Sequence, residues 1–224
     1  MKNTEKSEQT EDKAKSDMLT SFFLNRHLND DKYQSVLKEL EEKDPKLIPM
    51  FREMKDFDIQ SLIKDNVFVA LVGAIVGQKI SFAKARSVRS NVYKLLGTDF
   101  SYQDISNIAD AELLKTGMST DNLTAVRKAC FFIQENKLNL QNVDELRKLK
   151  QVRGIGDWTI NNVLLMCLLD TDAFCSGDSH IQKRVKELYG LTSIGPKLLE
   201  EISVKWRPYR AIVCWYLWRY KLSM

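Results

Sequence analysis

The sequence has little cysteine, and none of it is arranged to hold a metal. Its four cysteines, Cys130, Cys167, Cys175 and Cys214, form no C-x-x-C pair and no iron–sulfur spacing. Zinc, redox and cluster chemistry are therefore disfavoured. Cys130, Cys167 and Cys214 lie among apolar neighbours and are expected to be buried thiols. We expect a protein without a metal or other cofactor.

Long hydrophobic runs are missing as well. The longest, residues 67–76, is about half of the roughly 20 residues that span a bilayer. The N-terminus lacks the apolar core of a secretory signal. The expectation is a soluble, intracellular protein with no membrane partner, in the nucleus if the source is eukaryotic and in the cytoplasm or nucleoid if it is bacterial.

The sequence lacks the patterns that predict β-strands and hairpins, and it shows helical periodicity. There is no Asn-Gly or Asp-Gly dipeptide, and apolar residues recur at three- and four-residue spacing, which predicts an all-α fold. Ser81 should cap a helix that Gly97 ends, and Asn142 with Glu145 resembles a capping box. The predicted helices cover residues near 33–40, 67–76, 81–96, 123–135, 142–150, 164–169, 181–189 and 212–222.

Charge is unevenly distributed. Residues 1–64 contain 12 Lys and Arg against 14 Asp and Glu, whereas residues 65–224 contain 22 against 16. A positive excess suits a polyanionic partner, although a solvated basic surface fits the same numbers. Residues 1–18 are almost without apolar side chains and predict a disordered tail, which leaves 19–224 as the folded domain.

The most informative stretch is residues 146–159, LRKLKQVRGIGDWT. It predicts a helix, a tight turn through Gly154 and Gly156, and a second helix. Glycines leave backbone N–H groups unshielded, and a helix start carries partial positive charge, so an anion such as phosphate can dock there. A plain helix–helix corner would have the same pattern.

A second stretch, residues 172–184, reads DAFCSGDSHIQKR. Asp178 stands where the next helix begins, and Asp is a common helix N-cap. His180 follows two residues later and is expected to be a surface residue, with a role as general base left open.

Together these two stretches resemble the helix-hairpin-helix DNA glycosylase superfamily, whose hairpin reads L-x-G-h-G-x-x-T-A and is followed by D-x-F and a catalytic Asp. Ile160 replaces the final Ala of that hairpin. The resemblance implies two helical lobes with a catalytic cleft between them, a monomer, and double-stranded DNA with damaged bases as partner. It makes Asp178 the catalytic residue. The DNA-binding residues it implies in the hairpin are Arg153, Gly154, Ile155, Gly156 and Thr159.

The residue two positions after the second hairpin glycine distinguishes glycosylases that also cleave the DNA strand from those that only hydrolyse the base–sugar bond. Family members that also cleave the strand carry a Lys there, which forms a Schiff base with the sugar, but this sequence has Trp158. Because Trp offers no amine nucleophile, the sequence predicts hydrolysis without strand cleavage. The AlkA-type 3-methyladenine DNA glycosylases share this Trp. Their pocket Tyr, three residues after the hairpin Thr, is Asn162 here.

The C-terminal segment resembles the W-x-P-W-R element of the same branch. Counting through it places Trp218 on the base-stacking Trp of the family, with Trp158 and Asn162 beside it in the base pocket, and makes Arg210 a DNA contact. A Trp face attracts cations, which favours positively charged alkylated purines. Trp206 and Trp215 are expected to belong to the core.

Residues 71–81 resemble the I-L-x-Q-Q-h-S segment of the family, which supplies the wedge that fills the gap left by a flipped base. Lys79 and Ile80 are the wedge candidates. The extra α/β domain of some bacterial relatives is expected to be absent.

Three functions stay open at this point. The leading one is a monofunctional glycosylase for alkylated purines such as 3-methyladenine and 7-methylguanine in base excision repair, with Asp178 stabilising an oxocarbenium-like sugar. The second is a glycosylase for oxidised guanine or for uracil or thymine mismatches. The third is a non-catalytic helix-hairpin-helix module that binds DNA.

Overall fold

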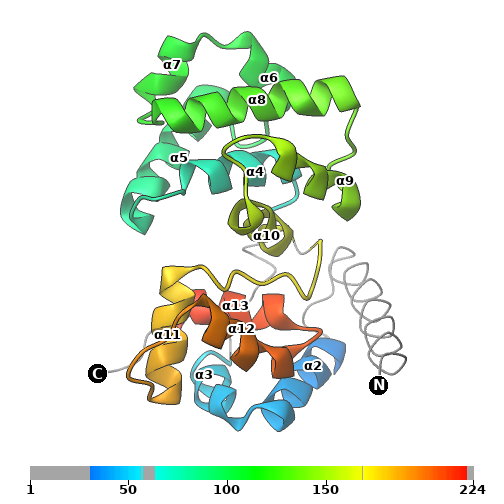
Figure 1. Ribbon diagram of the computed structural model, residues 1–224, viewed down its shortest axis with the longest axis vertical. Coiled ribbons are helices and arrows are strands. Elements are labelled where there is room, and N and C mark those ends of the chain that lie inside the picture. The colour runs from blue at the N-terminus through cyan, green and yellow to red at the C-terminus, as the bar shows by residue number, and fades with distance from the viewer. Residues whose placement is uncertain (1–30, 56, 58–63, 168, 221–224) are drawn as a thin grey trace. The chain divides into compact units, whose positions relative to one another are not determined.

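The computed structural model describes residues 31–55, 57, 64–167 and 169–220. The predicted tail, residues 1–18, lies outside them. Every regular element in these ranges is a helix, so the all-α prediction is confirmed. The chain divides into two compact units, one of residues 64–167 and one that combines the segments before and after it (Figure 1). None of the helices described is long and apolar enough to cross a bilayer.

The unit of residues 64–167 is organised around one apolar helix. All ten residues of α4 (Val67–Val76) are buried, as expected for a helix that is apolar on every side. It packs against α5 (Phe82–Leu96), α8 (Thr120–Asn136) and α10 (Asp157–Met166). The remaining elements of this unit are α6 (Tyr102–Asn107), α7 (Asp110–Lys115), α9 (Val143–Lys148) and the 3-10 turn Leu149–Gln151.

Capping residues set the helix ends in this unit. The Ser81 hydroxyl accepts the amide of Lys84, and Gly97 ends α5 at a φ of +84°, in agreement with the sequence prediction. Asn142 caps α9 as expected, but the capping box is wrong. The Glu145 carboxylate accepts the amide of Asn139 at 2.6 Å instead, because the preceding turn brings that donor within its reach.

The other unit is built from the two ends of the described chain. Its helices are α2 (Asp31–Lys43), α3 (Ile48–Glu53), α11 (Ser179–Tyr189), α12 (Pro196–Ser203) and α13 (Arg210–Arg219). Residues 210–217 of α13 are all buried. The buried carboxylate of Asp44 accepts the indole N–H of Trp206 at 2.6 Å and the hydroxyl of Tyr189. These bonds tie the N-terminal segment to the C-terminal helices.

The short helices are the main difference from the predicted elements. Four helices that were not predicted, α3, α6, α7 and α12, have six to eight residues, too few turns to repeat an apolar stripe. Of the helix expected at 164–169, residues 164–166 are the last ones of α10, which begins at Asp157 and ends at Met166. All four cysteines are buried, Cys175 included. Burial raises the pKa of the Cys130 thiol to about 11 and that of Cys167 to about 12.

Candidate functional site

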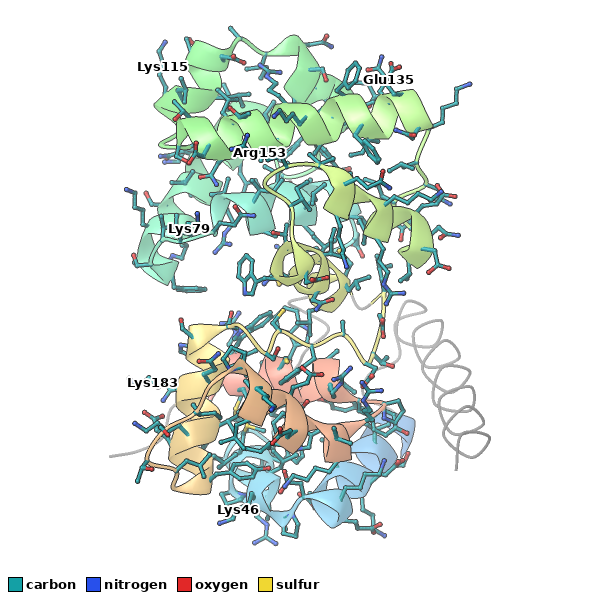
Figure 2. The ribbon with its side chains drawn as sticks, in the orientation of Figure 1. Lys46, Lys79, Lys115, Glu135, Arg153 and Lys183 are labelled. Carbon is teal, nitrogen blue, oxygen red and sulfur yellow. The ribbon has the colours of Figure 1, made fainter. Side chains whose placement is uncertain are left out.

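The hairpin turn between α9 and α10 requires glycine at one of its two glycine positions. Gly154 has a φ of +102°, and a Cβ added there would lie 2.9 Å from the Cβ of Ala125 in α8. Gly156 has a φ of −114° and ends the turn as the N-cap of α10, and a Cβ added there would meet no atom within 4 Å. Arg153 and both glycines are exposed, and Figure 2 labels Arg153 at this turn.

We expect Gly154→Ala to destabilise the fold by about 2–3 kcal/mol, because it combines a left-handed backbone with a contact too close for two carbons. Gly156→Ala is the matched control: its φ is ordinary and its Cβ meets nothing, so its cost should stay below about 1 kcal/mol. Urea denaturation measures both. Equal losses in the two variants would contradict the steric explanation.

Only part of the hairpin is available to a partner. The Ile155 side chain is 4% exposed, and its amide donates to the Val152 carbonyl at 3.0 Å. The Ile155 amide therefore closes the turn, and the contact of this residue with DNA stays a prediction. Helix α10 begins without a side-chain cap, so the amides of its first turn remain the anion-binding candidates.

Thr159 is internal as well. Its side chain is buried, and its hydroxyl accepts a hydrogen bond from Nε2 of Gln78 at 2.8 Å. The same Nε2 donates to the Gly154 carbonyl at 2.9 Å. Its hydroxyl thus connects the hairpin to the end of α4, and its contact with DNA stays a prediction. Sequence reasoning missed Gln78, although a polar residue directly after a fully buried helix was a usable signal.

The residues predicted for the base pocket lie on two helices, one in each unit. Trp158 and Asn162 are one turn apart on α10, and both are half-buried. Trp218 on α13 is also half-buried and packs edge-to-face on Trp215, with ring centroids 5.3 Å apart. Trp215 and Trp206 are buried, which confirms their assignment to the core. Partial exposure leaves Trp158, Asn162 and Trp218 as pocket candidates.

The connection between α4 and α5 holds the two wedge candidates. Lys79 is exposed and has a φ of +57°, a conformation that costs a non-glycine residue on the order of 1 kcal/mol. Ile80 is half-buried. Figure 2 shows Lys79 at this connection. Such strain is typical of functional loops, and the wedge role stays a prediction.

Asp178 is the N-cap of α11, and its side chain is held in one orientation. Its Oδ1 accepts the amides of His180 at 2.9 Å and Ile181 at 3.0 Å. Within the described residues both side-chain hydrogen bonds fall on Oδ1, and Asp178 is half-exposed. The capping interpretation is thus confirmed, and a partly accessible, fixed carboxylate is compatible with the catalytic one. Desolvation and the charge of Arg184 lower the pKa of His180, which favours the neutral imidazole at pH 7.

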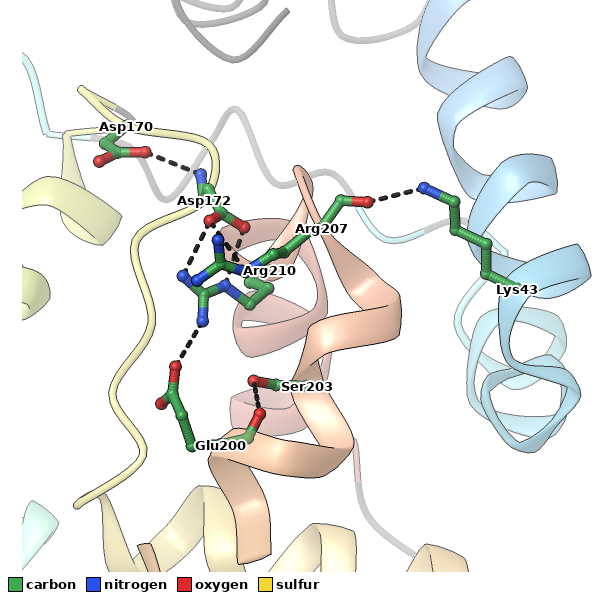
Figure 3. A network of polar contacts seen from close by, with 7 residues as sticks. All are labelled: Lys43, Asp170, Asp172, Glu200, Ser203, Arg207 and Arg210. Carbon is green, nitrogen blue, oxygen red and sulfur yellow. Dashed lines mark hydrogen bonds and ion pairs between the residues drawn. The ribbon is translucent and has the colours of Figure 1, made fainter. Parts of the chain in front are cut away.

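A buried ion pair supports the segment that leads to Asp178. Arg210 binds Asp172 through two hydrogen bonds, Nε to Oδ1 and Nη2 to Oδ2, both 2.8 Å, and donates to Glu200 at 2.7 Å (Figure 3). The Arg210 side chain is only 9% exposed. Carboxylates of the same unit thus take up the guanidinium, and the contact of Arg210 with DNA stays a prediction. Burial raises the pKa of the Asp172 carboxyl, against the opposing effect of Arg210.

Comparison with known proteins finds similarity to DNA glycosylases. No protein-family model matches the chain. A DNA-3-methyladenine glycosylase of Bacillus subtilis is 25% identical over 172 residues, which cover 69% of this chain but 57% of the relative. A DNA-3-methyladenine glycosylase of Saccharomyces cerevisiae is 23% identical over 88% of this chain and 82% of its own length.

The solved structure of a 3-methyladenine DNA glycosylase of Schizosaccharomyces pombe, Mag1, in complex with abasic DNA superimposes with a TM-score of 0.71. The match covers 83% of this chain and 95% of that one at 18% identity. The expected resemblance to DNA glycosylases is confirmed: the chain has the fold of the Mag1 structure, and its sequence is similar to those of the two DNA-3-methyladenine glycosylases.

Proposed function

We propose that this protein is a monofunctional DNA glycosylase of base excision repair that removes alkylated purines from double-stranded DNA. The names of its relatives support the substrate class. The observation that carries the chemistry is the position of Asp178, whose carboxylate is fixed by two amides at the start of α11 and remains partly accessible. Trp158, in place of a Schiff-base lysine, supports hydrolysis without strand cleavage.

One carboxylate is enough for this reaction because the substrate is already activated. A purine alkylated at N3 or N7 carries positive charge and leaves without a general acid. The sugar then develops oxocarbenium character, which a neighbouring carboxylate stabilises while it orients or deprotonates a water. In this proposal Oδ1 of Asp178 anchors the side chain and Oδ2 faces the reaction. The half-buried Trp218 is the candidate for stacking on the base, and an aromatic face favours a cationic base over normal bases.

The substrate assignment is tested with duplexes that carry 3-methyladenine, 7-methylguanine, oxidised guanine or uracil. We expect release of the two alkylated purines alone, with strand breaks only after alkali and no adduct trapped by borohydride. Release of oxidised guanine or uracil would favour a different glycosylase, and a trapped adduct would contradict the monofunctional assignment. If every base is retained but the protein still binds the duplexes, it is a binding module.

A further inference from the structure

The positive charge of the chain is concentrated in one segment. Residues 66–98, which include α4 and α5, contain five Lys and Arg and no Asp or Glu. Residues 65–224 as a whole have an excess of six basic residues, so this segment holds nearly all of it. Lys79, Lys84 and Arg86 are exposed. A run of exposed basic side chains without an acidic residue among them is complementary to a phosphate backbone.

An aromatic side chain projects from the middle of this segment. Phe82, the first residue of α5, is 75% exposed, more than any other large hydrophobic residue that the structure describes. The buried side of α5 consists of Ala85, Val88 and Val92, so Phe82 contributes little to the core. Exposing a phenyl ring to this extent costs hydrophobic free energy, which binding to a partner would recover.

Arg89 fixes the surroundings of this ring. Its guanidinium carbon lies 6.0 Å from the Phe82 ring centroid, and Nη1 donates to the Gly73 carbonyl at 3.3 Å. A Cβ at Gly73 would lie 3.3 Å from Cδ of Arg89, so the glycine makes room for this side chain along α4. Anchoring Arg89 on α4 holds a cation beside the ring and restricts where the phenyl face can turn.

We propose that Phe82 stacks on an unpaired base of DNA at the lesion, while Lys84 and Arg86 contact the flanking phosphates. Bases stack on aromatic side chains without regard to sequence, and a flipped or lost base leaves its neighbours partly unstacked. The absence of acidic residues from 66–98 argues for nucleic acid over a protein partner. The inference rests on the proposed function and assigns it a contact in addition to the wedge candidates Lys79 and Ile80.

The test measures binding of the full chain to a duplex with a central abasic analogue across a series of salt concentrations. Phe82→Ala should weaken binding by about 5- to 100-fold at every salt concentration, with an unchanged slope of log affinity against log salt. Arg86→Gln should reduce that slope by about one. Phe82→Trp should restore affinity. Phe131→Ala is the matched control, because Phe131 is 67% exposed but lies on α8 outside the basic segment.

The outcomes separate this contact from the proposed function. Binding by Phe82→Ala within about twofold of wild type, or an equal loss in Phe131→Ala, overturns the stacking contact even if wild type excises alkylated purines. Failure of the wild-type chain to bind the abasic duplex overturns both proposals. Thermal unfolding of Phe82→Ala at the wild-type temperature excludes a folding defect as the cause of weaker binding.

Discussion

Asp178→Asn is expected to lower the single-turnover rate of alkylpurine release by about 100-fold or more while the fold remains intact. Asparagine keeps a side-chain oxygen that can accept the amides of His180 and Ile181, and Asn is as good an N-cap as Asp. The substitution therefore removes the negative charge that stabilises the sugar cation and leaves the start of α11 in place.

Asp178→Ala provides the comparison, because it removes the charge and the cap together and should also cost about 1 kcal/mol of stability. Single-turnover excision and urea denaturation on the same three proteins separate the two effects. Full activity of Asp178→Asn would show that the carboxylate acts as a cap alone. Binding to an abasic duplex should be retained in Asp178→Asn, which distinguishes a chemical defect from loss of DNA affinity.

The largest effect on stability is expected from Arg210→Met. The substitution keeps apolar volume in the core but leaves the Asp172 carboxylate, 19% exposed, without its two hydrogen bonds. Removing one partner of a buried ion pair costs about 3–5 kcal/mol, because the other charge stays desolvated. Arg207, whose Nε is 3.7 Å from Asp172, offsets only part of this loss. Urea denaturation measures it.

The loss of stability in Arg210→Met should depend on pH, and the direction of the Asp172 pKa shift determines how. Burial raises that pKa in the folded chain, so the native state holds the proton more tightly than the unfolded state, and stability falls as pH rises through the folded pKa. Without Arg210 the shift should grow, and the deficit of Arg210→Met should shrink as pH approaches about 4. The double variant Asp172→Asn with Arg210→Met should recover part of the stability at pH 7. A deficit that does not change with pH, and is not relieved in the double variant, would assign the loss to packing.

The sequence predicts those features that depend on neighbouring residues. Ser81 and Gly97 bound α5 where expected, and Asp178 caps α11, because capping is decided within one helical turn. The hairpin glycines and the DNA glycosylase resemblance are visible for the same reason, as both are carried by short stretches of chain.

Contacts between residues that are far apart in the chain could not be predicted from the sequence. Asp172 and Arg210 are 38 residues apart. The residues next to each of them in sequence do not predict the ion pair, and the motif around Arg210 predicts a DNA contact. Gln78 and Thr159 are 81 residues apart and meet only because α4 packs against α10. A polar residue in a recognised motif can therefore have a structural role that its neighbours in sequence do not predict.

The order of the chain has a consequence for biosynthesis. Residues 64–167 form one unit from consecutive sequence, whereas the other unit needs α2 and α3 from before that stretch and α11 to α13 from after it. As the ribosome releases the chain from the N-terminus, the inserted unit can close as soon as α10 has emerged. Helices α2 and α3 lack their packing partners α11 to α13 until translation is nearly complete. Until then, apolar side chains that are buried in the folded chain, such as Leu40 and Met50, remain exposed. The segment made first is therefore open to aggregation for longer than the middle of the protein.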